Sequence, residues 1–269
     1  MSAASKTLEL LEFFSPAQPE IGLTQLCRLA GRDKATTYRH LQALETAGFV
    51  EQNPLTRQYR LGPKLLQLAQ TREITVPRKS SAEAPLRALA DITGETTHVS
   101  ILSGQSLFKL TSFESPQHSI RVIIDIDEFP LHATASGLCA LAFGPERLLA
   151  TAHKNMHAFT PETATQQSML QELIDSARQS GFSRAMGSFE ADVYSQAAPL
   201  FDQTGAFAGA VSVATVATRF TPELERLIQK NLRTASRQIT QNWGGMVPNA
   251  IETAWAETLA QSEEMETVR

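Results

Sequence analysis

Residues 23–62 constrain the fold more than any other part of the chain, because cap and turn residues divide them into short pieces. Thr24 is expected to cap a short helix that ends at Gly31, where a tight turn must begin. Asp33 is expected to cap a longer helix that stops at Gly48. Two helices joined by a short turn that contains glycine are typical of a helix-turn-helix.

A further helix and a hairpin complete this pattern. Leu8, Leu11 and Phe14 recur at helical spacing before a pair of prolines, and they predict an additional helix. Residues 49–62 alternate apolar and polar side chains around a turn-forming loop, which predicts two strands. Three helices followed by a hairpin predict a winged helix-turn-helix, in which the third helix enters the major groove of DNA.

The third helix is expected to have one buried side and one side that contacts DNA. Thr37, Leu41, Leu44 and the following Phe49 should pack against the other helices. The residues expected to contact DNA are Lys34, Ala35, Thr36, Tyr38, Arg39 and Gln42 on the helix and Arg57 and Arg60 on the wing. The alternative is a solvated helix face beside an ordinary hairpin. Helix, wing and local charge together favour DNA contact.

The charge of the chain is unevenly distributed. Residues 1–80 contain four lysines and seven arginines against seven acidic residues. Residues 81–269 contain thirteen basic against twenty-one acidic residues, and the whole chain has a net charge of −4. A basic module on an acidic body is consistent with a polyanionic partner such as DNA, although charge alone does not decide this.

Length and composition favour two globular domains. The chain has 269 residues, of which 42% are hydrophobic and 19% charged. Cys27 and Cys139 lack the spacing of a disulfide framework or a zinc site. No stretch reaches the roughly 18 apolar residues of a transmembrane helix. We therefore expect a soluble, cytoplasmic protein with no membrane contact, no metal and no cofactor.

The second part of the chain mixes helical and strand patterns. The segments expected as strands are 96–104, 106–113, 119–126, 194–202 and 205–216. The segments expected as helices are 87–94, 136–143, 168–182 and 222–242. Neighbouring strands separated by short turns predict an antiparallel sheet with helices on its faces, which is an α+β domain.

Motifs in both halves resemble one family. The stretches GLTQLCRLAGRDKATTYRHLQALETAGFVEQ and YRLGPKLLQLA are similar to the DNA-binding domain of the IclR family of bacterial transcription regulators. FPLHATASGLCALAF and GSFEADVYSQAAPLFDQTGAFAGAVSVATVATRFT resemble its effector-binding domain. The resemblance runs from about residue 5 to residue 243. Asp33 departs from it, since the family often has proline there.

The resemblance implies a domain organisation and a mode of action. A winged helix-turn-helix is expected over 1–62, a linker helix over 63–80, a GAF-like effector-binding domain over 81–245, and an acidic C-terminal tail over 246–269. The family's linker helices help a dimer to form, so a homodimer or a dimer of dimers is expected. Packing of the linker on its own wing is the alternative. Whether the protein is a repressor or an activator stays open.

A pocket for an organic anion is expected at the start of the helix near residue 136. The small residues at 133–137 leave the first backbone N–H groups of that helix accessible to a carboxylate. The family pocket, carried over by resemblance, comprises Ala135 and Ser136 as N–H donors, Ser195 as a polar wall residue and Ser212 as a strand hydroxyl.

Two alanines make this pocket less polar than that of relatives that bind the smallest keto acids. The second strand hydroxyl is replaced by Ala214, and some relatives have an acidic residue in place of Ala185. A larger or partly aromatic acid is therefore expected. The alternative is a second domain that serves only as an oligomerisation scaffold without a ligand.

Catalysis is not expected. His98, His132 and Cys139 are the residue types of a nucleophile and its base, yet they stand in no nucleophile-elbow, HExxH or paired-carboxylate pattern. His132 and Cys139 are interpreted as structural. The acidic segment 252–266 carries Trp255 and Leu259 at helical spacing, and is either a docked terminal helix or a frayed extension.

Overall fold

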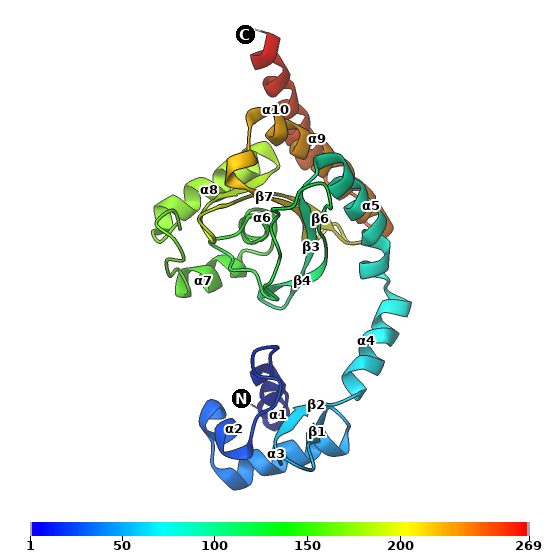
Figure 1. Cartoon of the computed structure of the whole chain (residues 1–269), viewed down its shortest axis with the longest axis vertical. Helices are drawn as coiled ribbons and strands as arrows, with labels where there is room; N and C mark the ends of the chain where they lie inside the picture. Colours follow the sequence, from blue (N-terminus) through cyan, green and yellow to red (C-terminus); the bar gives the residue numbers. More distant parts are fainter. Residues whose placement is uncertain (1, 268–269) are drawn as a thin grey trace. The chain divides into compact units, whose positions relative to one another are not determined.

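The computed structural model describes residues 2–267, with side chains described through residue 261. The chain divides into two compact units, Met1–Val76 and Pro77–Arg269 (Figure 1). None of the helices among the described residues is long and apolar enough to cross a lipid bilayer.

The first unit is the predicted winged helix-turn-helix followed by one more helix. Its elements are α1 (Ala3–Leu8), the 3-10 helix η1 (Glu9–Phe13), α2 (Leu23–Ala30), α3 (Lys34–Thr46), β1 (Val50–Gln52), β2 (Tyr59–Leu61) and α4 (Lys64–Thr75). Strands β1 and β2 pair antiparallel. The helices and strands of this unit enclose a core that contains Leu10, Leu26, Leu41 and Tyr59, all nearly inaccessible to solvent.

Two details at the start of this unit differ from the sequence prediction. The first helix tightens into η1 at Glu9, so Leu10 is buried and Leu8 is exposed. Thr24 does not cap α2, because Gly22 is the N-cap and Thr24 lies inside the first turn. The helix begins early because Ile21 pairs with Tyr59 on the wing and the chain turns directly after this bridge.

The second unit is built on a five-stranded antiparallel sheet. Its strands are β3 (Thr96–Ser103), β4 (Ser106–Phe113), β5 (Ser183–Met186), β6 (Val193–Phe201) and β7 (Phe207–Val216), in the order β4-β3-β7-β6-β5. The edge strand β5 was not predicted, because four residues are too few for a recognisable alternation.

Helices cover both faces of this sheet, as an α+β domain requires (Figure 1). The elements α5 (Arg78–Thr93) and α9 (Pro222–Asn242) pack on one face around Val99, Val211 and Val213. On the other face lie α6 (Ala135–Phe143), α7 (Arg147–Lys154) and α8 (Gln167–Ser180). Residues 78–80, predicted in the linker, form the first turn of α5, because the break falls at Val76 and Pro77.

The prediction of a strand over residues 119–126 is wrong. This segment is extended but has no partner strand, and side chains bind its carbonyl groups instead. Thr96 Oγ1 donates to the carbonyl of Val122 at 2.6 Å, and Lys109 Nζ donates to that of Ile124 at 3.0 Å. The alternating apolar residues match a strand pattern, but side chains of β3 and β4, instead of a neighbouring strand, bind two of the backbone carbonyl groups.

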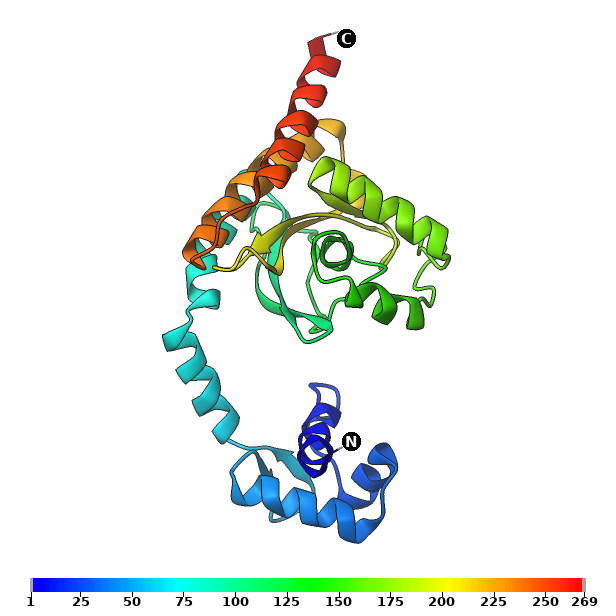
Figure 2. The same ribbon diagram turned by 180° about the vertical axis from the view of Figure 1, so that it is seen from behind.

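The C-terminal segment is a docked helix. The helix α10 (Asn249–Thr267) packs against α8 and α9 (Figure 2). Trp255 is fully buried, and its indole N–H donates to the carbonyl of Gly181 at 2.8 Å. Glu252 forms ion pairs with Arg233 and Arg237 on α9. Of the two alternatives left open by the sequence, the docked helix is therefore observed.

Trp255→Ala is expected to lower the free energy of unfolding of the second unit by about 3–5 kcal/mol, because it empties a buried aromatic site. Urea unfolding followed by Trp243 fluorescence measures this. Glu257→Ala, two residues further along on the exposed side of α10, is the matched control and should change stability by less than about 0.5 kcal/mol. Equal stabilities of the two variants would contradict the docked helix.

Candidate DNA-reading surface and ligand pocket

The polar face of α3 is exposed and its apolar face is buried, as predicted. Thr37, Leu41 and Leu44 are buried, and Phe49 packs against the same core. The exposed side consists of Lys34, Ala35, Tyr38, Arg39 and Gln42, with Thr36 half-buried beside them. Gln42 Nε2 donates to the Tyr38 hydroxyl at 3.0 Å, so these two side chains form one polar pair.

Asp33 caps α3 and is therefore occupied. Its carboxylate accepts a hydrogen bond from the N–H of Thr36 at 2.8 Å, and this bond lowers the pKa of Asp33. The acid stabilises the helix N-terminus, where negative charge is favourable. On the buried side, the His40 ring nitrogen Nδ1 bonds to the Thr7 hydroxyl at 2.7 Å and ties α3 to α1. The sequence prediction did not include this contact.

The wing presents two arginines in different situations. Arg60 forms a 2.6 Å ion pair with Glu51 and lies 3.6 Å from Glu20, so its charge is already compensated. Arg57 lies at the wing tip in the left-handed backbone region, with a φ of 60°. Within the described residues, its guanidinium has no hydrogen-bond or ion-pair partner, and neither have the side chains of Lys34 and Arg39.

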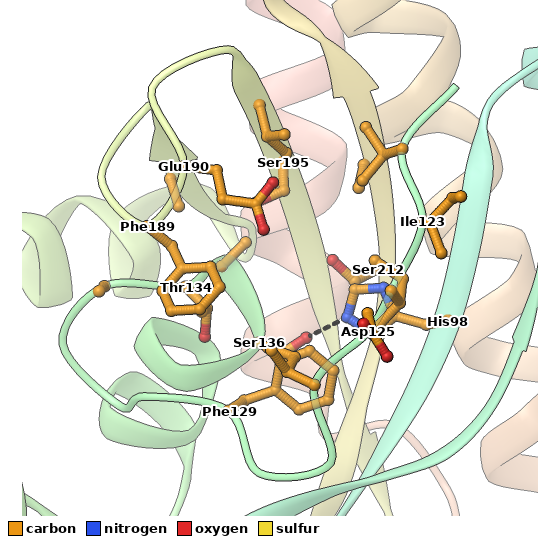
Figure 3. Close-up of a pocket in the computed structure, with 18 residues that line it drawn as sticks. His98, Ile123, Asp125, Phe129, Thr134, Ser136, Phe189, Glu190, Ser195 and Ser212 are labelled. Carbon is orange, nitrogen blue, oxygen red and sulfur yellow. Dashed lines mark hydrogen bonds between the residues drawn. The ribbon is translucent and has the colours of Figure 1, made fainter. Parts of the chain in front are cut away.

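The second candidate site is a pocket between the sheet and the start of α6 (Figure 3). Its floor consists of two rows of residues, each made of direct neighbours on adjacent strands of the sheet. Ala214, Ser195 and Ala185 form one row, and Ser212 lies opposite His98 in the other. Alternate residues of a strand point to the same face, so both rows project toward α6.

The first turn of α6 is held on this floor by hydrogen bonds and close packing. Ser183 Oγ donates to the carbonyl of Ala135 at 2.7 Å, and Ser188 Oγ donates to that of Ala133 at 2.9 Å. Gly137 has no room for a side chain, because a Cβ there would lie 2.4 Å from the carbonyl oxygen of Pro130. The start of α6 therefore has a fixed position over the pocket.

This position leaves two backbone donors free. Thr134 is the N-cap, and its hydroxyl accepts from the N–H of Gly137 at 3.0 Å. The N–H groups of Ala135 and Ser136 have no acceptor among the described residues. Both residues line the pocket. The N-terminus of a helix with free N–H groups is suited to binding an anion.

His98 is a pocket residue that the sequence analysis did not predict. It is 4% exposed, stacks on Phe129 with ring centroids 4.8 Å apart, and its Nε2 lies 3.0 Å from Ser136 Oγ. Burial, with a smaller effect from Lys109, lowers the pKa of His98 to about 3, so the imidazole is neutral at physiological pH. His98 lies opposite Ser212, which was expected in the pocket, but this pairing of strands cannot be inferred from the sequence.

The pocket encloses about 520 Å³ of empty space, part of which is open to solvent. The segment predicted as a strand forms one side through Val122, Ile124 and Ile126. Phe129 and Phe189 add aromatic surface. Two exposed carboxylates, Asp125 and Glu190, also line it, and among the described lining residues there is no lysine or arginine.

His98, His132 and Cys139 do not form a catalytic arrangement. Burial raises the pKa of the Cys139 thiol, so the reactive thiolate is disfavoured. His132 bonds to the carbonyl of His157 at 2.9 Å and lies beside Phe159. Within the described residues there is also no group of three or more side chains arranged to hold a metal ion.

Comparison with known proteins decides the family. Residues 75–241 match the family model described as the bacterial transcriptional regulator IclR C-terminal domain, and residues 3–54 match the IclR helix-turn-helix domain. The chain belongs to the IclR family. It is a DNA-binding transcriptional regulator of this family.

Individual IclR-family members align over most of their length. The HTH-type transcriptional regulator XynR of Escherichia coli is 27% identical over 221 residues, which cover 81% of this chain and 88% of XynR. The crystal structure of an IclR regulator from Silicibacter sp. TM1040 has a TM-score of 0.89 and 39% identity, covering 93% of this chain and 99% of that chain.

One solved IclR homolog carries a small acid. The homolog from Microbacterium hydrocarbonoxydans, crystallised with 4-hydroxybenzoate, has a TM-score of 0.73 and 22% identity and covers 90% of this chain and 99% of that one. At this identity the likeness shows a shared fold.

The neutral, buried state of His98 predicts a pH dependence of stability. Below about pH 6.5 the unfolded chain binds a proton at His98 that the folded chain does not bind. The free energy of unfolding therefore decreases as the pH is lowered. Between pH 7.5 and 5.0 this one residue should remove about 2 kcal/mol. Urea unfolding monitored by Trp243 and Trp255 reports the second unit alone. His98→Gln should lose less stability over this interval, and an unchanged loss would contradict the prediction.

Proposed function

We propose that this IclR-family regulator reads DNA through α3 and the wing tip, and that a small organic monocarboxylic acid in the α6 pocket controls its DNA affinity or activity. The observation that carries the ligand proposal is the pair of free N–H groups on Ala135 and Ser136 above a largely apolar cavity. A carboxylate can accept from both, and the helix N-terminus favours its negative charge.

The lining of the pocket supports one negative charge on the ligand. Its donors are neutral, and the carboxylates of Asp125 and Glu190 repel a second anionic group. Phe129 and Phe189 can contact a ring, and the alanines at 185 and 214 reduce the polar surface. The Microbacterium homolog in complex with 4-hydroxybenzoate supports an aromatic acid as the class of ligand.

The DNA-reading surface is proposed from the exposed side chains described above. Lys34, Arg39 and Arg57 have no partner among the described residues and can meet phosphate or guanine without losing an existing contact. Arg60 is proposed to support the wing through Glu51 and Glu20, with a weaker contribution to DNA contact than Arg57.

A homodimer or a dimer of dimers is proposed from α4. Leu66, Leu68 and Ile74 are exposed on this helix, and Leu66 is 68% and Ile74 81% accessible. The rest of the described first unit leaves these side chains exposed to solvent. A second copy of the chain is a suitable cover for them, and two DNA-reading helices would then bind two half-sites.

Arg39→Ala should weaken binding to a duplex selected by the protein from a random-sequence library by about 1–3 kcal/mol, because a base or phosphate contact is lost. A gel shift at fixed salt measures the dissociation constant. Arg72→Ala removes the same charge from α4 of the same unit, and should have a smaller effect. DNA binding by Arg39→Ala equal to that of the wild type, or loss of its fold, would contradict the proposed surface.

A thermal-shift screen tests the ligand. The panel contains benzoate, 4-hydroxybenzoate, phenylacetate, hexanoate, pyruvate and the dicarboxylate phthalate. At least one monocarboxylate should stabilise the second unit, by about 2.7 kcal/mol at 100 times its dissociation constant. Phthalate should stabilise it less than benzoate.

Blocking the cavity is the control for this screen. Ser195→Leu fills the pocket from β6 and should abolish the stabilisation, whereas Ser176→Leu on the exposed side of α8 should retain it. A wild-type protein that no acid of the panel stabilises at millimolar concentration would support the scaffold without a ligand.

A further inference from the structure

His98 has one ring nitrogen engaged and one without a partner. Its Nε2 lies 3.0 Å from the hydroxyl oxygen of Ser136, while Nδ1 is buried and has no hydrogen-bond partner among the described residues. Buried polar atoms in proteins are normally paired, because an unpaired one loses its bonds to water without compensation. Figure 3 shows the ring beside Ser136, Ser212 and Phe129 in the wall of the pocket.

The neutral imidazole has two tautomers, and the bond to Ser136 allows both. Either Nε2–H donates to the Ser136 hydroxyl, or the hydroxyl donates to Nε2 and the proton is on Nδ1. Ser136 Oγ has no other hydrogen-bond partner within the described residues, so it can take either role. In the second tautomer Nδ1–H is a neutral donor for which the described residues provide no acceptor.

We propose that His98 determines the specificity of the pocket: its Nδ1–H donates to the carboxylate of the bound acid, while the Ser136 hydroxyl donates to Nε2. This inference rests on the proposed function of the pocket. Together with the N–H groups of Ala135 and Ser136, it provides three neutral donors from the sheet and from α6. A carboxylate accepts several hydrogen bonds, and bonds to a charged acceptor are the stronger ones.

This arrangement explains how an anion binds where no cationic side chain lines the wall. Ser136 contributes twice, with its N–H to the ligand and with its hydroxyl to His98, so the helix start and the ring are set together. The stacking on Phe129 fixes the plane of the imidazole, which restricts the direction in which Nδ1–H can donate. An ester or amide of the same acid lacks the charge and should bind more weakly.

Two variants remove opposite halves of the imidazole. The side-chain nitrogen of asparagine lies as many bonds from Cα as Nδ1 of histidine, and that of glutamine as many as Nε2. His98→Asn therefore keeps the donor proposed for the ligand and loses the bond to Ser136, and His98→Gln does the reverse. Calorimetric titration of the full chain uses whichever panel monocarboxylate binds the wild type most tightly.

His98→Gln should weaken binding of this acid at least tenfold, and His98→Asn should weaken it by less than about fivefold. Equal affinities for the two variants, or the reverse order, would overturn the role of Nδ1 while leaving the proposed function intact. If the wild type binds no acid of the panel, the proposed function fails and this inference fails with it.

A second measurement is independent of the stability of the variants. In the wild-type chain with ¹⁵N-labelled histidine, long-range ¹H–¹⁵N spectra distinguish protonated from unprotonated ring nitrogens. Saturating acid should give the His98 ring, assigned by its loss in His98→Gln, a protonated Nδ1 and an unprotonated Nε2. The opposite pattern in the acid-bound protein would overturn the proposal.

Discussion

The pocket depends on how the first turn of α6 is attached to the sheet. Two serine hydroxyls, from Ser183 and Ser188, donate to the carbonyl groups of Ala135 and Ala133 on either side of the N-cap, and Gly137 allows the backbone to approach residue 130. With its carbonyls fixed in this way, the turn presents the N–H groups of Ala135 and Ser136 in constant positions. A fixed set of donors binds an anion without paying the entropy of ordering flexible side chains.

The two units differ in the kind of group that they offer to an anion. The pocket uses fixed, neutral donors, which suit a small ligand with one negative charge. The proposed DNA-reading surface presents the exposed cations of Lys34, Arg39 and Arg57, which have no partner among the described residues and suit a polyanion. A ligand changes DNA affinity only if it binds two states of the protein unequally. Control by an acid therefore requires the connection through α4 and α5 to transmit a difference between those states.

The elements that were predicted correctly carry strong local signals. Asp33 and Gly31 mark the ends of two helices by their capping chemistry, and α9 begins at Pro222 after a threonine cap. The inward side of α3 followed from helical periodicity. Ala135, Ser136, Ser195 and Ser212, expected at an effector site from family resemblance, line one pocket, and their role in binding stays a prediction.

The errors and omissions arise from long-range contacts. The segment 119–126 has a strand pattern, but its backbone is bound by Thr96 and Lys109 instead of a neighbouring strand. His98 became a pocket residue only through the pairing of β3 with β7, which places it opposite Ser212. The docking of α10 depends on space next to Gly181 that accepts Trp255, and periodicity cannot reveal such a space.

The proposed control of DNA binding by an acid in the α6 pocket links the two units in function. The most direct measurement is the fluorescence anisotropy of a labelled, selected duplex, titrated with protein in the absence and presence of a saturating stabilising monocarboxylate. The dissociation constant is expected to change about fivefold or more, in either direction, and this change should be lost in Ser195→Leu. A dissociation constant that stays the same while the acid is bound would contradict it.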